Sequence, residues 1–281
     1  NDGLSAADDE KPPRSVAQAK KRSNYPFYFA GMKRENDQFE EKKCLGPYVK
    51  REPWMKVLRG IWAPFKIKTD ENGKKFAKGR YVIDGSKQGA DSYKETYAPT
   101  LREESLFIIL IKSTSHPEAI LSTSDISGAY LNADMDIELY TPGIEGFNQE
   151  PGKVRRILKA MYGTKQAQRL WRELYVKVFQ ELGFKMNPAD QCVFSFRNGA
   201  QWMDIGVHVD DFIILSSDLA LLNWFISEAN KHFKLNQSPS LSTFVGLNIK
   251  RTSSEGTCTV TVDQTDAIDE LLKDVNLSDC K

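Results

Sequence analysis

The stretch from residue 193 to residue 216 most constrains the fold of this chain. It reads VFSF, an Asn198-Gly199 turn, WMDIGVHV, an Asp-Asp pair and FIILS. Runs of β-branched and aromatic residues separated by turn residues predict antiparallel strands, and an Asn-Gly pair is typical of the tight turn that joins two of them. The pattern therefore predicts three consecutive antiparallel strands, with Asp210 and Asp211 where the second strand ends.

Asp210 and Asp211 place two like charges side by side. One interpretation is an Asp-rich turn whose carboxylates accept hydrogen bonds from nearby backbone amides. The other is a turn that holds a divalent cation, because carboxylate oxygens are ligands that Mg²⁺ prefers and a cation cancels their repulsion. The pair alone is compatible with both interpretations.

Helical and strand patterns alternate through the middle of the chain. Apolar residues at helical spacing predict a long helix over 165–183 and shorter helices over 103–113 and 218–233. A buried strand is expected over 120–126, with Asp125 at its end. This order predicts an α+β fold in which helices cover one face of an antiparallel sheet.

A second hairpin is predicted between residues 62 and 84, where two alternating runs flank an Asn-Gly turn. Lys78 and Arg80 lie two residues apart on its second strand, so we expect their side chains on one face. Taken by themselves, these two residues are typical of a solvated hairpin face.

The composition limits the class of protein. A hydrophobic content of 40% supports a packed core, and no run approaches the roughly 20 apolar residues of a membrane span, so we expect no membrane association. The four cysteines show no CxxC spacing, which favours neither a zinc site nor a disulfide framework and predicts a reducing, intracellular compartment. A net charge of +1 still allows basic and acidic regions to segregate, so nucleic acid is not excluded as a partner.

Seven segments in a fixed order resemble the reverse transcriptase region of copia-type LTR retrotransposon polyproteins, an RNA-dependent DNA polymerase. The segments are KGRYVIDGSKQ (78–88), YAPTLREES (97–105), SDISGAYLNADMDIELYTP (124–142), VRRILKAMYGTKQAQRLW (154–171), HVDDFII (208–214), FVGLNI (244–249) and VNLSDCK (275–281). The resemblance covers residues from about 60 to 281, and the order of the segments makes it specific.

The resemblance implies a right-hand polymerase fold within the α+β class, with fingers, a palm whose antiparallel sheet is backed by helices, and a truncated thumb. The chain begins with Asn1, and we expect it to be a piece of a longer polypeptide. The expected parts are a flexible linker over 1–24, fingers with an N-terminal packing segment over 25–118, a palm over 119–262 with a fingers insertion at about 143–170, and the start of a thumb over 263–281.

Three aspartates match the family's catalytic positions. The resemblance implies that Asp125 and Asp210 bind both metal ions, and that Asp211 is the less direct companion of Asp210. The implied cofactor is Mg²⁺, with Mn²⁺ as the alternative ion. Two such ions activate an oxygen nucleophile and stabilise a leaving phosphate oxygen, which is the chemistry of phosphoryl transfer.

Four further residues match positions that bind the incoming nucleotide. Tyr130 would fill the space that a ribose 2′-hydroxyl needs and so select deoxynucleotides, with core packing as the alternative role. Lys78 and Arg80 would hold the β- and γ-phosphates as pyrophosphate leaves. Gln166 would lie near the incoming nucleotide and the template base.

The resemblance also implies contacts with primer and template. Phe244, Val245 and Gly246 match the hairpin that grips the primer terminus, where a glycine permits close backbone approach. Lys165 would reach a backbone phosphate, and His208 would help to position the primer.

The chain departs from the family pattern at several positions. His208 stands where the family usually has Tyr, and Asp84 with Gly85 replaces a more basic stretch. Thr164 and Ser124 stand where Leu is usual. None of these departures removes a carboxylate.

The leading hypothesis is a reverse transcriptase that copies RNA and DNA templates from deoxynucleoside triphosphates. The alternative is a domesticated or decayed palm that binds nucleic acid without catalysis. A metal-dependent nuclease is less favoured, because His116 and His232 are typical of surface or helix-end residues rather than of bases that activate water. The expected partners are an RNA and DNA primer-template and the nucleotides, in the cytoplasm, in a virus-like particle or, alternatively, in the nucleus. The oligomeric state is not predicted.

Overall fold

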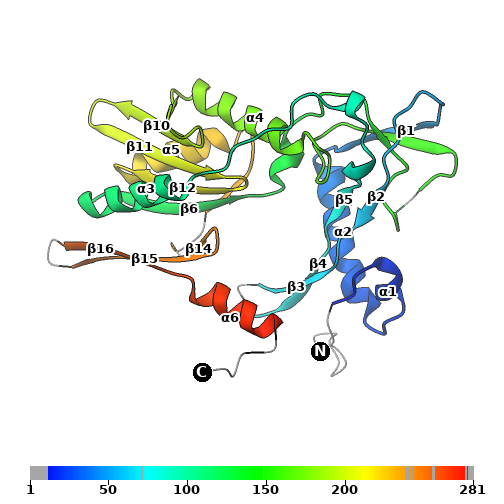
Figure 1. Ribbon diagram of the computed structural model, residues 1–281, viewed down its shortest axis with the longest axis horizontal. Helices are drawn as coiled ribbons and strands as arrows, with labels where there is room; N and C mark the ends of the chain where they lie inside the picture. The colour runs from blue at the N-terminus through cyan, green and yellow to red at the C-terminus, as the bar shows by residue number, and fades with distance from the viewer. Residues whose placement is uncertain are drawn as a thin grey trace. The chain divides into compact units, whose positions relative to one another are not determined.

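The computed structural model describes residues 12–70, 72–147, 149–237, 241, 243–254, 257–275 and 277. The chain forms two compact units (Figure 1). The first unit comprises the chain up to Tyr97 together with Tyr130–Trp171, and the second comprises Ala98–Ala129 and Arg172–Lys281. The boundary at Trp171 falls inside the long helix predicted from the apolar spacing.

The first unit is built on one long helix and three small antiparallel sheets. The sheets have the strand orders β1-β8-β7, β2-β5 and β3-β4. The elements are α1 (Val16–Lys20), α2 (Tyr25–Glu41), β1 (Leu45–Lys50), β2 (Gly60–Trp62), β3 (Lys66–Thr69), β4 (Lys75–Lys78), β5 (Tyr81–Ile83), β7 (Tyr140–Thr141) and β8 (Lys153–Ile157), with the 3₁₀ turns η2 (Gly85–Lys87), η3 (Ala90–Ser92) and η4 (Ala129–Asn132).

Helix α2 carries the core of this unit. Its fully buried Tyr28, Met32 and Phe39 lie on one side of the helix, while charged residues occupy the other. Gly31 lies on the buried side, where a Cβ atom would stand 2.4 Å from the Ala77 carbonyl oxygen, so the absence of a side chain lets strand β4 pack directly on α2. This contact fixes the hairpin of β3 and β4 against the helix.

The predicted flexible linker over 1–24 is partly structured. Residues 1–11 lie outside the described residues, but Ser15 caps α1 by accepting a hydrogen bond from the backbone of Gln18. Val16 and Ala19 of α1 are buried, three residues apart on one face. Two apolar residues suffice to dock so short a helix, and this is why the segment shows no longer periodic pattern.

The predicted hairpin between residues 62 and 84 forms, but its second half is two strands. Strands β3 and β4 pair around the Asn72-Gly73 turn, with Lys66 opposite Lys78. The chain then leaves β4 at Gly79 and Arg80, and β5 pairs with β2 instead. The expectation that Lys78 and Arg80 share one strand face is therefore wrong, because Arg80 lies in the connection between β4 and β5.

The second unit contains a six-stranded antiparallel sheet with the strand order β13-β6-β12-β11-β10-β9. The predicted three-strand meander is confirmed as β10, β11 and β12. The elements are α3 (Glu103–Ser115), β6 (Ile120–Ile126), α4 (Ala167–Glu181, shared with the first unit), β9 (Lys185–Met186), β10 (Val193–Asn198), β11 (Gln201–His208), β12 (Asp211–Ser216), α5 (Leu219–Ala229), β13 (Leu235–Gln237), β14 (Thr243–Phe244), β15 (Leu247–Ser254), β16 (Thr257–Asp263) and α6 (Thr265–Asp274).

Helices cover both faces of this sheet, not one face as the sequence predicted (Figure 1). Phe212 of β12 points to α4, where its ring centroid lies 5.7 Å from that of Phe179. Ile213, the next residue, belongs to a core cluster on the other face with Leu106 and Ile109 of α3. The alternation of β12 between the two faces explains why this strand is apolar from Phe212 to Leu215.

Strands β14, β15 and β16 form a separate three-stranded sheet that packs on α3. Arg251 of β15 joins the two, because its guanidinium donates hydrogen bonds to four carbonyl oxygens near the C-terminal end of α3. The acceptors are the carbonyl oxygens of Ala119 (2.6 Å), His116 (2.8 Å), Ser113 (2.9 Å) and Pro117 (3.2 Å). A cation at this end also interacts favourably with the helix dipole.

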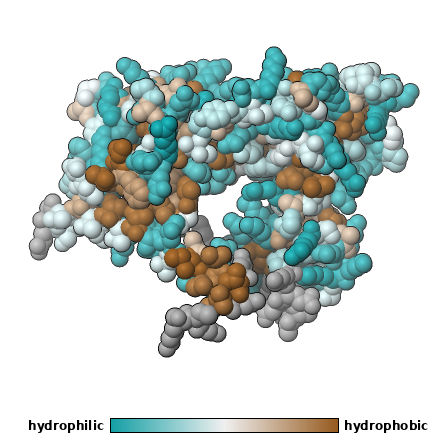
Figure 2. Space-filling model, viewed as in Figure 1, coloured by the Kyte–Doolittle hydropathy of each residue, from teal (hydrophilic) through white to brown (hydrophobic). Residues whose placement is uncertain are grey.

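Helices α3 and α6 of the second unit both expose apolar side chains. In α3 these are Phe107, Ile108 and Ile111, and in α6 they include Ile268 and Leu271. Figure 2 shows hydrophobic surface at the places of both helices. Across the residues that the structure describes, no helix is both long enough and apolar enough to cross a membrane.

Candidate active site

The edge of the second unit's sheet brings together residues from four strands. Asp211 of β12 is the direct pairing partner of Asp125 on β6 and of His208 on β11. Asn236 of β13 is the partner of Asp125 from the other side. Directly opposed residues in antiparallel strands point to the same face. The side chains of Asn236, Asp125, Asp211 and His208 therefore form one row across the sheet, on the face that α3 covers.

Asp210 lies beside this row, in the two-residue turn between β11 and β12. Its carbonyl oxygen accepts a hydrogen bond of 2.9 Å from the backbone of Ile126, which ties the turn to strand β6. Val209, the other turn residue, has a φ angle of +60°. This conformation disfavours a β-branched side chain and costs about 1–3 kcal/mol, so the surrounding strands must impose the turn. Strain of this kind is concentrated at functional sites.

The electrostatics of the row confirm that its carboxylates are close. The pKa of Asp211 is raised to about 6. Burial of the carboxyl group is the largest cause of this rise, and the charges of Asp210 and Asp125 are the next. Asp125 is exposed, whereas Asp210 and Asp211 are half-buried. The site therefore concentrates negative charge, and no cation is among the causes of the raised pKa of Asp211.

The donor set fits a divalent metal, although the carboxylates do not form a finished cage. Oxygen ligands suit Mg²⁺ or Mn²⁺, and a cation would relieve the repulsion that raises the pKa of Asp211. Among the described residues, no three His, Cys, Asp or Glu side chains are grouped tightly enough to hold a metal ion. The convergence of Asp125, Asp210 and Asp211 on one metal ion therefore stays a prediction.

A cleft of about 290 Å³ in the same unit gathers most of the predicted primer-binding residues. His208, Phe244 and Val245 line it, together with residues from the start of α3 such as Arg102. Val245 and Gly246 have φ angles of +52° and +75°, which is the turn that joins two antiparallel strands tightly. The segment predicted to hold the primer terminus is therefore a tight hairpin turn. Its residues Phe244 and Val245 border the cleft, which lies next to the carboxylate row.

The predicted nucleotide-binding residues all lie in the first unit. The guanidinium carbon of Arg80 stands 5.1 Å from the centre of the Tyr162 ring. The Tyr162 ring in turn lies 5.2 Å, centroid to centroid, from the ring of Tyr130. Arg80 is exposed and the two rings are half-buried, so these three residues form a continuous group at the surface.

Gln166 and Lys165 belong to a neighbouring network of the first unit. Gln166 is fully buried, and its side-chain oxygen accepts a hydrogen bond of 2.7 Å from Gln88. Its amide nitrogen donates to Asp136 at 3.3 Å. The Lys165 ammonium lies 3.1 Å from the Tyr93 hydroxyl and above the Tyr93 ring. Gln166 therefore supports the segment from inside the unit, while Lys165 is exposed.

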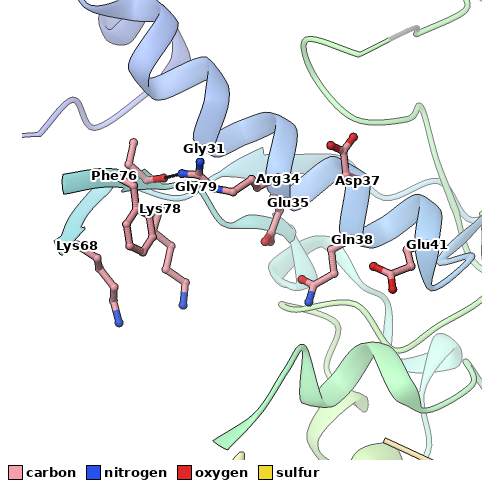
Figure 3. A pocket seen from close by; sticks show the side chains of 11 residues that line it. Gly31, Arg34, Glu35, Asp37, Gln38, Glu41, Lys68, Phe76, Lys78 and Gly79 are labelled. Carbon is pink, nitrogen blue, oxygen red and sulfur yellow. Dashed lines mark hydrogen bonds between the residues drawn. The ribbon is translucent and has the colours of Figure 1, made fainter. Parts of the chain in front are cut away.

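Lys78 borders a pocket of about 630 Å³ between α2 and the β3-β4 hairpin (Figure 3). The side chains of Lys68 and Lys78 extend in the same direction from the hairpin, while Glu35, Gln38 and Glu41 line the pocket from α2. Burial raises the pKa of Glu35, against the hydrogen bond from the Tyr81 backbone and the nearby charges of Arg80 and Lys78. One wall of the pocket is thus cationic and the other is acidic.

Sequence reasoning missed two residues of these groups, Asn236 and Tyr162. Asn236 lies on a strand of only three residues, too short for a periodic pattern, and its role depends on pairing with Asp125. Its amide donates a hydrogen bond of 2.6 Å to the Ser127 hydroxyl. Tyr162 stands inside a segment quoted for the resemblance, and its two ring contacts come from residues far away in the chain.

The fold and the row define a class of protein: an α+β chain that presents clustered carboxylates from adjacent strand ends. Comparisons with known proteins identify the family. Its profile, described as reverse transcriptase (RNA-dependent DNA polymerase), matches residues 51–281. The chain therefore belongs to the reverse transcriptase family, and the prediction made from the seven segments is confirmed.

Several individual proteins are similar to this chain. It is 30% identical over 178 residues to a retrovirus-related Pol polyprotein from transposon RE2 of Arabidopsis thaliana, covering 62% of this chain and 12% of that protein. It is 26% identical over 251 residues to a retrovirus-related Pol polyprotein from transposon TNT 1-94 of Nicotiana tabacum, covering 86% and 18%. A solved foamy viral protease-reverse transcriptase in complex with double-stranded DNA aligns with 14% identity and a TM-score of 0.44, over 79% of this chain and 34% of that one. The chain thus spans less than a fifth of the length of the two transposon Pol polyproteins.

Proposed function

We propose that this chain is the polymerase part of a retrotransposon reverse transcriptase. It adds deoxynucleotides to the 3′-hydroxyl of a primer paired with an RNA or DNA template. The observation that carries the proposal is the pairing of Asp211 with Asp125 on adjacent strands, with Asp210 in the turn beside them, in a chain of this family. The primer oxygen attacks the α-phosphorus, and the bond between this phosphorus and the leaving pyrophosphate breaks.

Asp125, Asp210 and Asp211 are the residues that would hold the metal. Mg²⁺ bound there would favour the ionised primer hydroxyl and offset charge on the phosphates. The raised pKa of Asp211 supports this role, because a bound cation most strongly stabilises a carboxylate whose ionised form is otherwise disfavoured. His208 and Asn236 flank the carboxylates in the row and would orient them or the reacting groups.

The nucleotide is bound by residues of the first unit. Arg80 and Lys78 are cations at exposed positions and would contact the phosphates, where their charge stabilises the pyrophosphate as it leaves. The Tyr130 ring would exclude a ribose 2′-hydroxyl. Gln166 would act from the interior, since its amide is engaged with Gln88 and Asp136, and would hold the segment that carries Lys165 in place.

The primer terminus would rest on the tight turn of β14 and β15. His208, Phe244 and Val245 border one cleft beside the carboxylate row, which supports their joint role as the surface under the primer. Gly246 has no Cβ atom and permits close approach of a nucleic-acid backbone. Lys165, an exposed cation of the first unit, would contact a backbone phosphate.

The same proposal assigns the parts of a right-hand polymerase. The six-stranded sheet with α4 and α5 would be the palm, and the first unit, with α2 and the β3-β4 hairpin, would be the fingers. Helix α6 would be the start of the thumb. Family membership and the strand order of the sheet support these assignments.

Primer extension tests the proposal. A labelled DNA primer annealed to RNA or to DNA would be incubated with the chain, Mg²⁺ and deoxynucleotides, beside an Asp210→Asn, Asp211→Asn double variant and an EDTA control. The proposal predicts extension by the parent alone. If neither protein extends the primer while both bind it in a salt-dependent way, the chain is a non-catalytic nucleic-acid-binding module instead.

A further inference from the structure

Tyr162 occupies the centre of the group formed by Arg80 and Tyr130. The guanidinium of Arg80 lies over the Tyr162 ring at 5.1 Å, within the range of a cation-π interaction. The Tyr130 ring lies 5.2 Å away, tilted by 53°. The residue proposed to bind phosphate and the residue proposed to exclude the 2′-hydroxyl therefore contact one shared ring.

The backbone on either side of Tyr162 is held firmly. Its carbonyl oxygen accepts a hydrogen bond of 2.7 Å from the backbone of Ile83, and its side chain packs against the core of the first unit. The next residue, Gly163, has a φ angle of +89° and lies so near Gly85 that a Cβ atom on Gly85 would stand 2.0 Å from the Gly163 carbonyl oxygen. Backbone contacts thus fix the main chain at Tyr162, and packing against the core holds its ring.

A fixed aromatic face restrains a flexible arginine. The Arg80 side chain is exposed and has several rotatable bonds, so it loses conformational entropy whenever it binds a phosphate. Holding the guanidinium over a ring beforehand reduces this loss. A cation-π contact at an exposed site is equivalent to about a two- to fivefold change in an equilibrium constant.

We propose that Tyr162 is a positioning residue for the incoming nucleotide, and that it couples phosphate binding to sugar selection. The Tyr162 ring holds Arg80 ready for the triphosphate and supports the Tyr130 ring where the ribose would lie. This inference rests on the proposed polymerase function. A purely structural role in packing would instead lower stability without changing the affinity for the nucleotide or the choice of sugar.

The test compares single-nucleotide incorporation by the parent and by Tyr162→Ala, Tyr162→Phe, Arg80→Ala and the Arg80→Ala, Tyr162→Ala double variant. The substrates are dTTP and 5-methyl-UTP, which differ only at the ribose 2′ position, opposite a template adenine, with KM and kcat measured for each. Tyr97→Ala is the matched control, because Tyr97 is 69% exposed in the same unit. Thermal unfolding of each variant records whether it folds.

Tyr162→Ala should raise the KM for dTTP by about two- to fivefold, change kcat by less than about twofold and reduce the preference for dTTP over 5-methyl-UTP by about threefold or more. Tyr162→Phe keeps the ring and should match the parent, as should Tyr97→Ala. The double variant should have the dTTP KM of Arg80→Ala, because the two residues act on phosphate binding as one unit.

Two results would overturn the inference while the polymerase function stands. One is a folded Tyr162→Ala variant with the parent's KM and sugar preference. The other is a double variant whose KM increase equals the product of the two single increases. A parent chain that extends no primer would instead overturn the proposed function, and this inference with it.

Discussion

Replacing Asp211 by asparagine should stabilise the metal-free protein. The side chain keeps its size and loses the charge that burial and the neighbouring Asp210 and Asp125 disfavour. The pKa of Asp211 rises from 3.8 to about 6 in the folded chain, a difference of roughly 2 units that corresponds to about 3 kcal/mol. Because the carboxylate is partly exposed, solvent screening reduces this to roughly 1–2 kcal/mol.

The sign of the pH dependence follows from the direction of the shift. The pKa is higher in the folded chain than in the unfolded chain, so Asp211 is protonated in both states below pH 3.8 and costs nothing there. The cost grows as the pH rises from 3.8, where the unfolded chain begins to ionise, and is complete above the folded value of about 6. The stability advantage of Asp211→Asn should therefore open between about pH 4 and pH 6.5 and stay constant above that range.

Urea unfolding in EDTA from pH 4 to pH 8 measures this difference. Asp263→Asn is the control, and its effect on stability should have the opposite sign. Hydrogen bonds from Thr265 and Asn248 lower the pKa of Asp263, so they favour the carboxylate that the substitution removes. Added Mg²⁺ should stabilise the parent and not Asp211→Asn, because only the folded parent binds the ion. The reasoning fails if Asp211→Asn has the parent's stability at pH 7.5, or if the advantage does not depend on pH.

Three further substitutions test particular contacts by urea unfolding. Ser124→Ala should stabilise the chain by about 1 kcal/mol, because the buried Ser124 hydroxyl has no hydrogen-bond partner among the described residues; a loss of stability would contradict this. Arg251→Met should cost about 2–3 kcal/mol, because it leaves the carbonyl oxygens at the end of α3 without their donor; an unchanged midpoint would refute that role. Gly163→Ala should cost more than about 2 kcal/mol, since its Cβ atom would meet the Ile83 carbonyl oxygen at 2.1 Å; a neutral result would show that the backbone there can move.

Local patterns predicted most of the second unit. The alternation from residue 193 to residue 216 and its turn residues set the pairing of β10, β11 and β12, and so the place of Asp210 and Asp211. Asp125 was placed correctly at the end of a buried strand. The prediction that helices cover only one face of the sheet was wrong. An apolar strand such as β12 indicates that both faces are covered, but not by which helices.

Other features depend on contacts between distant segments. The chain leaves strand β4 at Gly79 because this residue packs on Trp62 and on the backbone of α2, and no local pattern records that contact. Helix α1 is held by two buried residues, too few to show a period. Asn236 and Tyr162 likewise owe their places to partners elsewhere in the chain, so they could be identified only from the structure.

We propose above that the carboxylate row carries out nucleotidyl transfer. The most direct test is the rate of single-nucleotide incorporation on an RNA template by Asp125→Asn, because Asp125 is exposed and its substitution leaves the core intact. We expect a rate about a thousandfold below that of the parent at saturating Mg²⁺, with Asp263→Asn unchanged. A folded Asp125→Asn variant that incorporates nucleotides within about tenfold of the parent rate would contradict the assignment of this row as the active site.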